Sequence, residues 1–267
     1  MRHVKPRLER PDEGRQSVTL RAGGAIGISV LGVEAGCGKS ALMAGVAATL
    51  RQQGVAVRAV KPICSGPQHK AEAEIAFLCS VTATPRNYPV SVLGVPAKFT
   101  LGQWQTSLSA VLSSANFTFV EGIGGVASVI AYDGTEGECY IDSAELASDL
   151  GFPCILVARH RRDCIEKLIM ANSYLTAQKL PVLGFVTVET EMGEGRELEA
   201  LYTRSSLELL FMARTGRSYL GCLKFSPSIS VLRSNQGNII KMTEGGVDLL
   251  TIRKGLERHG FVLPVAK

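Results

Sequence analysis

The sequence lacks any uninterrupted apolar run of the about 18 residues that a membrane-crossing helix needs. Its first ten residues are basic but contain no apolar segment of the kind found in secretory signals. These two absences predict a cytoplasmic protein with no membrane partner.

Paired metal-ligand cysteines are also absent. None of the seven cysteines belongs to a Cys-x-x-Cys pair, and none is spaced with a histidine as in zinc sites. This odd set predicts reduced thiols rather than a disulfide framework or a zinc site. Cys37 and Cys64 fall in loops expected near an active site, where we favour small loop-filling side chains over oxidation-sensitive thiols.

Acidic residues are slightly fewer than basic residues: 29 basic and 24 acidic residues give a net charge of +5. Residues 1–21 hold six of the basic and three of the acidic residues, so much of the excess lies at this end. We expect residues 1–23 to form a flexible basic tail and residues 24–267 a single domain. A solvated tail is favoured over one that binds nucleic acid.

Short apolar runs alternate with segments of helical character from residue 25 onwards. The runs show little polar alternation, which is typical of strands buried on both faces. Strands are expected at 25–31, 55–60, 116–121, 153–158, 181–187 and 219–224. Helices are expected near 41–53, 71–80, 103–115, 141–150, 163–179, 195–215 and 244–258. This order predicts an α/β fold of the P-loop NTPase type, with a doubly wound, mostly parallel sheet and helices on both faces.

A glycine-rich loop joins the first expected strand to the first expected helix, reading Gly32-Val33-Glu34-Ala35-Gly36-Cys37-Gly38-Lys39-Ser40. In such loops the backbone N–H groups and the helix N-terminus face the phosphates of a nucleotide. The lysine reaches the outer phosphates and the hydroxyl can ligate Mg²⁺. Because the first glycine stands one residue earlier than in the strict pattern, a glycine-rich turn with a chance Lys-Ser is the alternative. The predicted nucleotide contacts come from two glycine-rich segments: Gly36, Cys37, Gly38, Lys39, Ser40, Ala41, Gly122 and Gly124.

Polar groups follow the next two expected strands, at the sheet edge where open parallel sheets bind ligands. The segment Lys61-Pro62-Ile63-Cys64-Ser65-Gly66 would bring an ammonium and a hydroxyl to the phosphate loop, or else it is a surface lysine before a turn. Glu121 ends a buried strand, where an acid would hold Mg²⁺. Glu74 is a third metal candidate, or a first-turn acid that the helix dipole favours.

The motifs Gly-x5-Gly-Lys-Ser, Lys-Pro-x-x-Ser-Gly and Val-Glu-Gly-x-Gly-Gly, followed by Leu220-Gly221, resemble those of the dethiobiotin synthetase family over about residues 26–225. The resemblance implies a seven-stranded parallel sheet and a homodimer. It also implies a ligase of biotin biosynthesis, which closes a cyclic urea on the vicinal diamine diaminopelargonate with CO₂ and Mg-ATP. The implied cofactors are therefore ATP and Mg²⁺.

The resemblance also implies roles for individual residues. Lys39 would stabilise the phosphates, Lys61 the carbamated substrate and the transferred phosphoryl group, and Ser65 would orient the substrate. These three are the implied catalytic residues. Mg²⁺ would be held by Ser40, Glu121 and Glu74.

The phosphate loop and the nucleotide base side depart from the family pattern. Val33, Glu34 and Ala35 replace Thr-Asp-Thr, so Ala35 removes a hydroxyl that the family places beside the substrate. Glu74 replaces an aspartate, and the short, octahedral coordination of Mg²⁺ tolerates the extra methylene poorly. Val188 stands where the family has an asparagine that reads adenine.

The segment 159–166 aligns with a family stretch that grips the substrate carboxylate across the dimer. Glu166 replaces an asparagine there and would repel a carboxylate. Arg159, Arg161 and Arg162 offer an anion site that the family lacks, or else form a solvated basic loop.

The departures gather on the diamine and adenine sides. The phosphate-binding motifs persist, so we predict a dethiobiotin synthetase-like ligase that acts on a small molecule, either a diamine or a carboxylate. The alternatives are a non-catalytic paralogue that binds a nucleotide or anion, and a relative acting on another substrate. A partition-type ATPase is disfavoured because the loop lacks that group's additional early lysine.

Overall fold

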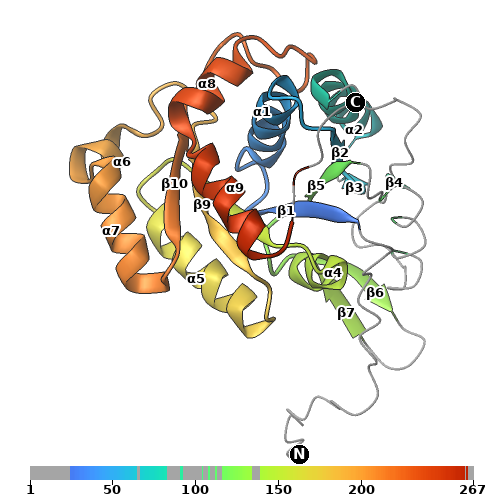
Figure 1. Ribbon diagram of the computed structural model, residues 1–267, viewed down its shortest axis with the longest axis horizontal. Coiled ribbons are helices and arrows are strands. Elements are labelled where there is room, and N and C mark those ends of the chain that lie inside the picture. The colour runs from blue at the N-terminus through green and yellow to red at the C-terminus, as the bar shows by residue number, and fades with distance from the viewer. Residues whose placement is uncertain are drawn as a thin grey trace, which may run out of the picture.

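A six-stranded parallel sheet forms the centre of the molecule (Figure 1). The computed structural model describes residues 25–64, 67–82, 91–92, 104, 108, 112, 116–133, 139–261 and 263. In spatial order the strands are β10 (Ser218–Leu223), β9 (Val182–Val188), β8 (Cys154–Arg159), β1 (Ile26–Gly32), β5 (Phe117–Glu121) and β2 (Val57–Val60). All six strands expected from the apolar runs are confirmed, with bounds shifted by one or two residues. The α/β, P-loop NTPase-like fold class is confirmed with them.

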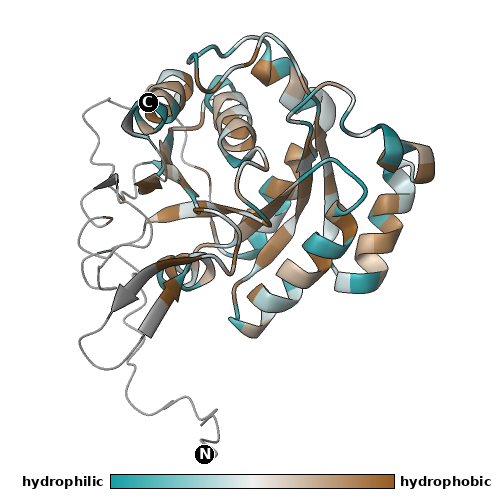
Figure 2. Cartoon of the chain, turned by 180° about the vertical axis from the view of Figure 1, so that it is seen from behind, coloured by the Kyte–Doolittle hydropathy of each residue, from teal (hydrophilic) through white to brown (hydrophobic). Residues whose placement is uncertain are grey.

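The strands are apolar because both faces of the sheet are covered. Every residue of β5 is buried, and β8 is buried from Cys154 to Ala158. Along β8, Ile155 and Val157 join one hydrophobic core while Leu156 joins a second core on the other face. Figure 2 shows the same division, with hydrophobic colour through the sheet and hydrophilic colour on the outward surfaces of the helices. The chain therefore uses both sides of its central strands to exclude water.

Two groups of helices form these covers (Figure 1). The first core receives side chains from α1 (Lys39–Gln52), α2 (Gln68–Thr82), α8 (Ile239–Gly246) and α9 (Leu249–Arg258). The second receives side chains from α4 (Ser143–Leu150), α5 (Cys164–Ala177), α6 (Arg196–Leu201) and α7 (Arg204–Thr215). The result is a three-layered arrangement of helices, sheet and helices.

Two expected long helices are wrong, because each contains a break. The expected helix at 195–215 is α6 followed by α7, with Tyr202 in an extended conformation between them. Thr203 caps the second helix by accepting a hydrogen bond from the Ser206 N–H. The expected helix at 244–258 is the end of α8 followed by α9, which Asp248 caps through the Thr251 N–H. The expected tail 1–23 and nearly all of the expected helix 103–115 lie outside the described residues.

Two small sheets were not expected from the sequence. One pairs β3 (Ile63–Cys64) with β4 (Ser91–Val92), and the other pairs β6 (Val129–Asp133) with β7 (Cys139–Asp142). The main sheet has six strands within the described part of the chain, rather than the seven that the family resemblance implied. In that part of the chain, no helix is both long enough and apolar enough to cross a bilayer.

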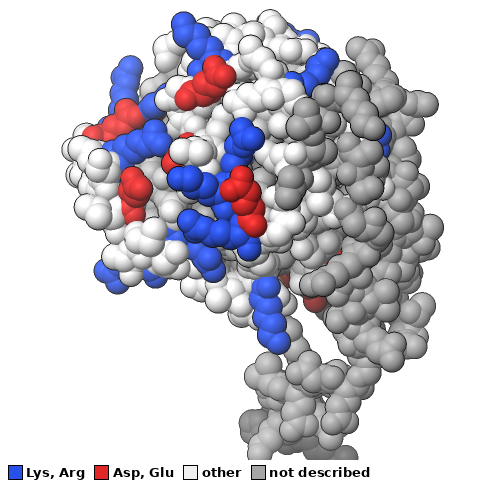
Figure 3. Space-filling view, viewed as in Figure 1, with Lys and Arg blue, Asp and Glu red and all other residues white. Residues whose placement is uncertain are grey.

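The strand order sets the position of the ligand-binding edge. β1 lies between β5 and β8, and the chain builds outward from it in both directions, to β2 on one side and to β9 and β10 on the other. In sheets of this kind the loops beyond the carboxyl ends of the central strands form a crevice that binds ligands. On the face drawn in Figure 3, the Lys and Arg side chains of the described residues lie among Asp and Glu side chains rather than in one unbroken basic surface.

Candidate functional site

The phosphate loop lies between β1 and α1, as predicted. Gly36 and Gly38 both have positive φ angles, of 69° and 92°. A Cβ atom on Gly38 would lie 2.5 Å from a methyl carbon of Val188, so only glycine allows the loop to pass so close to β9. Gly38 also caps α1 without a side-chain hydrogen bond, which leaves the N–H groups of the first helical turn for another acceptor.

Lys39 crosses from the phosphate loop to the glycine segment after β5. Its ammonium donates hydrogen bonds to the backbone carbonyl of Glu34 at 3.1 Å and to that of Gly124 at 2.9 Å. The residue is 7% exposed. The two glycine-rich segments predicted to contact a nucleotide are therefore joined by this one buried cation.

Lys61, Ser40 and Glu121 converge beside the phosphate loop. The Glu121 Oε1 atom accepts hydrogen bonds from the Ser40 hydroxyl at 2.9 Å and from the Lys61 ammonium at 2.8 Å. Lys61 also forms an ion pair of 2.6 Å with Glu74 on α2. Four predicted residues from β5, α1, α2 and the end of β2 thus form one cluster, in which Lys61 contacts the other three.

Lys61 is a fixed positive charge in this cluster. Burial lowers the pKa of its ammonium, but Glu121 and Glu74 outweigh this effect and hold the pKa above its ordinary value. Its side chain is 11% exposed and that of Glu121 is 2% exposed. Water therefore screens this ion pair little, and Lys61 is suited to stabilising negative charge rather than to exchanging protons.

The second carboxylate oxygen of Glu121 points to a role in binding a metal ion. Oε2 is buried and has no hydrogen-bond partner among the described residues. A buried carboxylate oxygen without a partner is costly, because it has lost its hydration without replacement. Carboxylate and hydroxyl oxygens are the donors that Mg²⁺ prefers, so Glu121 and Ser40 fit the predicted ion.

The remaining predicted residues have different outcomes. Glu74 lies in the second turn of α2, so its interpretation as a first-turn acid is wrong. Its role as a metal ligand stays a prediction, since its carboxylate contacts Lys61. Ala41 and Gly122 line the same cleft as Lys39 and Ser40. Ser65, predicted to be catalytic, lies outside the described residues.

These residues line a cleft of about 500 Å³. We call one part the charged end, formed by the phosphate loop, the start of α1 and the cluster around Lys61 and Glu121. We call the other part the apolar end, formed by the last residues of β9 and β10 and the segments that follow them: Val188, Glu189, Thr190, Leu223, Lys224, Phe225, Ser226, Ile229, Val231 and Leu232. Val188 packs on Gly38 and joins the two ends.

The polar network beside the apolar end was missed by the sequence analysis. Lys224 follows β10, and its ammonium pairs with Glu189 at 3.0 Å and closely with Glu199 on α6. His160 follows β8 and is 3% exposed, with Nδ1 at 2.7 Å from the Thr187 hydroxyl. Burial lowers the pKa of His160, and the charge of Lys224 lowers it further. The only sequence signal for these residues was their position after strands.

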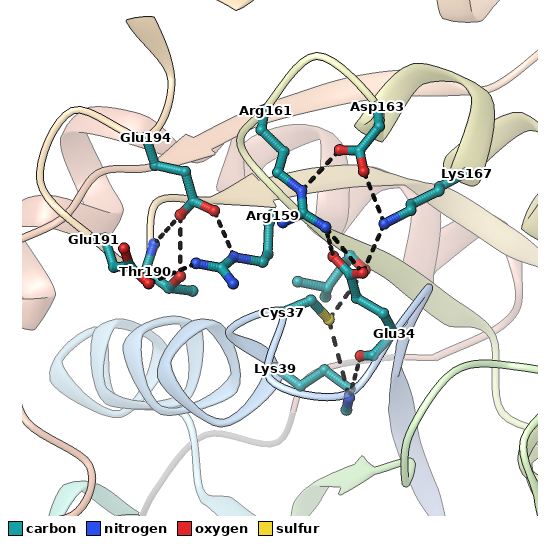
Figure 4. A network of polar contacts seen from close by, with 11 residues as sticks. Glu34, Cys37, Lys39, Arg159, Arg161, Asp163, Lys167, Thr190, Glu191 and Glu194 are labelled. Atoms are coloured by element: carbon teal, nitrogen blue, oxygen red, sulfur yellow. Dashed lines mark hydrogen bonds and ion pairs between the residues drawn. The ribbon is translucent and has the colours of Figure 1, made fainter.

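Two of the three arginines of the expected anion site, Arg159 at the end of β8 and Arg161 just after it, are paired with acidic side chains. Figure 4 shows Arg161 facing Glu34 of the phosphate loop, and the pair is 3.0 Å apart. Arg159 faces away from that pair and binds Glu191 and Glu194 at the loop after β9 (Figure 4). These arginines are therefore neutralised by acids of the same chain, and they brace the phosphate loop and the β9 loop against β8.

Glu34 receives a second cation from α5. Lys167 reaches its carboxylate at 2.7 Å, and Asp163 pairs with both Lys167 and Arg161 (Figure 4). Glu34, together with Val33 and Ala35, stands where the family has Thr-Asp-Thr. Its side chain is thus fixed by α5 and by the turn before that helix.

The cysteines near the site fill space. Cys37 and Cys64 are fully buried, and Cys37 donates a hydrogen bond to the Val157 carbonyl. Burial raises the pKa of the Cys37 thiol, and it raises that of Cys64 to about 11. Neither is a thiolate at neutral pH, which supports the interpretation as loop-filling side chains.

Comparison with known sequences agrees with this geometry. The profile of a family described as an AAA domain matches residues 27–230, from β1 through the phosphate loop and into the apolar end. The chain belongs to this family. The matched region contains every predicted site residue and the charged end of the cleft, and it stops just before Val231 and Leu232 of the apolar end.

Within this family the chain is a divergent dethiobiotin synthetase-like member. It is 24% identical over 245 residues to the ATP-dependent dethiobiotin synthetase of Nitrosopumilus maritimus, an alignment that covers 85% of this chain and 99% of that relative. It is 29% identical over 166 residues to the enzyme of the same name from Mycobacteroides abscessus, covering 59% of this chain and 71% of that one. The resemblance drawn from the motifs is thereby confirmed.

Solved structures with a similar fold include the cell division protein MinD of Aquifex aeolicus. Its complex with MinC matches with a TM-score of 0.53 and 13% sequence identity, covering 91% of this chain and 99% of that one. MinD by itself matches with a TM-score of 0.52 and 12% identity, covering 90% and 100%. These likenesses concern the fold alone.

Proposed function

We propose that this chain is an ATP-dependent carbon–nitrogen ligase of the dethiobiotin synthetase type. The proposal rests on one observation above all: Ser40, Lys61 and Glu121 meet beside the phosphate loop, with the buried Glu121 Oε2 unpaired among the described residues. Transfer of a phosphoryl group depends mainly on positioning and on neutralising charge, and this cluster provides both.

The proposed reaction begins with a vicinal diamine whose first amine adds to CO₂ and loses a proton, forming a carbamate. A carbamate oxygen then attacks the γ-phosphorus of ATP, and ADP leaves. The second amine attacks the carbamoyl carbon of this mixed anhydride, inorganic phosphate leaves, and a cyclic urea results. Lys39 binds the phosphates, and Lys61 stabilises the negative charge of the carbamate and of the transferred group.

Mg²⁺ fits this site through Ser40 and Glu121, with Glu74 as the third proposed ligand. When bound, the ion would neutralise phosphate charge and fix the orientation of the polyphosphate. The Lys61 ammonium donates a hydrogen bond to Oε1 of Glu121, so Oε2 is left to bind a second cation. We further propose a homodimer, as in the family that the motifs resemble, and a cytoplasmic enzyme whose residues 24–267 form one P-loop domain.

A direct assay tests the ligase proposal. The purified full chain would be incubated with diaminopelargonate, bicarbonate and Mg-ATP, with the cyclic urea detected by mass spectrometry and ADP by a coupled assay. The proposal predicts both products in equal amounts, and their loss in Lys61→Met. Release of ADP without a cyclic urea would redirect the proposal to another acceptor, and neither product at high enzyme concentration would contradict it.

A second candidate function is nucleotide binding without catalysis. It is favoured by Ala35, which brings no hydroxyl to the cleft, and by the engagement of Lys61 with two carboxylates at once. Calorimetry that showed Mg-nucleotide binding, with no ADP release in the presence of any acceptor tried, would support this candidate over the ligase.

A further inference from the structure

The polar side chains of the apolar end are already bonded within the protein. The Thr190 hydroxyl donates to Glu194 at 3.0 Å, and the Ser226 hydroxyl donates to Asn238 at 2.8 Å. The remaining two, Glu189 and Lys224, pair with each other at 3.0 Å. The hydroxyl protons of Thr190 and Ser226 are therefore committed within the chain, and Glu189 and Lys224 offset each other's charge.

Three backbone N–H groups nearby are engaged as well. Glu189 N–H donates to the Leu223 carbonyl at 2.9 Å. Thr190 N–H donates to Glu194 at 2.8 Å, and Phe225 N–H donates to Glu189 at 3.2 Å. These donors hold the segments after β9 and β10 together, and so they are withheld from the ring nitrogens by which adenine differs from other bases.

Apolar groups form most of what is left for a ligand to touch. Val188, Leu223, Ile229, Val231 and Leu232 line this end, and Leu232 is 55% exposed. Every nucleobase has flat apolar faces that such side chains can contact. A pocket that binds through apolar contact discriminates weakly between ligands of similar shape, whereas a pocket that donates hydrogen bonds rejects a ligand that lacks the matching acceptors.

We propose that the cleft accepts nucleoside triphosphates as a class, binding the polyphosphate at the charged end and selecting only weakly among the bases at the apolar end. This inference rests on the nucleotide-binding part of the proposed function. ATP is then one of several phosphoryl donors, and affinity comes mainly from the triphosphate and the metal ion.

Equilibrium binding tests the inference without requiring turnover. Dissociation constants of the full chain for ATP, GTP, CTP and UTP, each with Mg²⁺, would be measured by calorimetry beside inorganic tripolyphosphate. The four nucleotides are expected to agree within about tenfold. A preference for ATP of more than about tenfold over each of the others would overturn the inference while leaving the ligase proposal intact. Absence of binding by all five would contradict both.

A matched pair of variants tests where the base lies. Leu232→Ala removes an exposed side chain of the apolar end, and Leu250→Ala removes one of 62% exposure on α9 that does not line the cleft. Leu232→Ala is expected to weaken all four nucleotides by about threefold and to leave tripolyphosphate unchanged. Leu250→Ala should change none of the five. If Leu232→Ala also changed none, the base would bind elsewhere and the inference would be wrong.

Discussion

At the charged end of the cleft, Lys39, Ser40, Lys61 and Glu121 come from separate segments and converge, with one buried carboxylate oxygen unpaired among the described residues. At the apolar end, Thr190, Ser226, Glu189 and Lys224 each bond to another group of the chain. A buried carboxylate oxygen without a partner favours the binding of a ligand, whereas a network whose groups are all paired mainly stabilises the wall of a pocket. On the proposed function, this contrast predicts that the chain selects its nucleotide mainly through the phosphates.

The largest expected effect comes from removing Lys39. Lys39→Met should lower ligase turnover by about 10²–10³-fold, because it deletes a buried cation aimed at developing negative charge. It should weaken nucleotides and tripolyphosphate alike, since both use the charged end. Lys254→Met, an exposed lysine on α9, is the matched control and should leave turnover unchanged. Equal turnover in both variants would contradict the claim that the charged end, rather than the apolar end, stabilises the phosphates.

Lys61→Met should show the next largest effect, on stability. In metal-free buffer it leaves Glu121 as a buried carboxylate without its cation, which costs about 3–5 kcal/mol of unfolding free energy in comparable pairs. Urea denaturation would measure the loss. Adding Mg²⁺ should restore part of it, because an ion that binds only the folded state stabilises that state.

The double variant Lys61→Met, Glu121→Gln removes both charges together. It should recover most of the stability that Lys61→Met loses, and it should no longer respond to Mg²⁺. A double variant that was as unstable as the single one would show that packing, rather than the charge of Glu121, explains the loss.

Glu34→Gln should have a smaller effect and would sharpen the comparison. It weakens the partly exposed pairs with Arg161 and Lys167, which together are worth about 1 kcal/mol. Nucleotide affinity should fall by no more than about threefold, because the backbone carbonyl that binds Lys39 is unchanged. Glu208→Gln on α7 is the exposed control. A much larger loss of affinity would mean that the loop's shape outweighs its charges.

The smallest effect concerns pH and the apolar end. Burial raises the pKa of Glu194, but hydrogen bonds from Thr190 and Arg159 outweigh burial and hold the pKa below its ordinary value of 4.5. A lowered folded-state pKa means that the stabilisation is present above pH 4.5 and is lost as the pH falls through the folded-state value. Urea denaturation between pH 7 and about pH 3 should show that loss, and Glu194→Gln should reduce it by less than about 1 kcal/mol. An unchanged acid profile in this variant would contradict the assignment.

The fold could be predicted largely because its signals are local. Six apolar runs gave six strands, since strands buried on both faces are mostly apolar. The breaks in the two expected long helices also have local sequence signals. These are Thr203 and Asp248, whose side chains cap the helices that follow them. They were missed because apolar periodicity continues across both breaks, and a cap residue inside such a pattern resembles an ordinary polar position.

The candidate site could be predicted only where residues act as part of a motif. The phosphate loop follows β1 and Glu121 ends β5, and because these two strands are neighbours, the contact follows from the strand order. The pairing of Lys224 with Glu189 and Glu199 could not be predicted from the sequence. It joins residues of separate elements, namely α6 and the ends of β9 and β10. Arg159 and Arg161 could not be paired from the sequence for the same reason, because Glu194 and Glu34 belong to distant loops.

A crystal structure with Mg²⁺ and a non-hydrolysable ATP analogue tests the central claim most directly. The account predicts the triphosphate on the phosphate loop beside Lys39, the metal ion bound to the Ser40 hydroxyl and to Glu121, and the base against Leu232 without a side-chain hydrogen bond. A nucleotide bound away from the phosphate loop, or a metal ion that Glu121 does not contact, would contradict it.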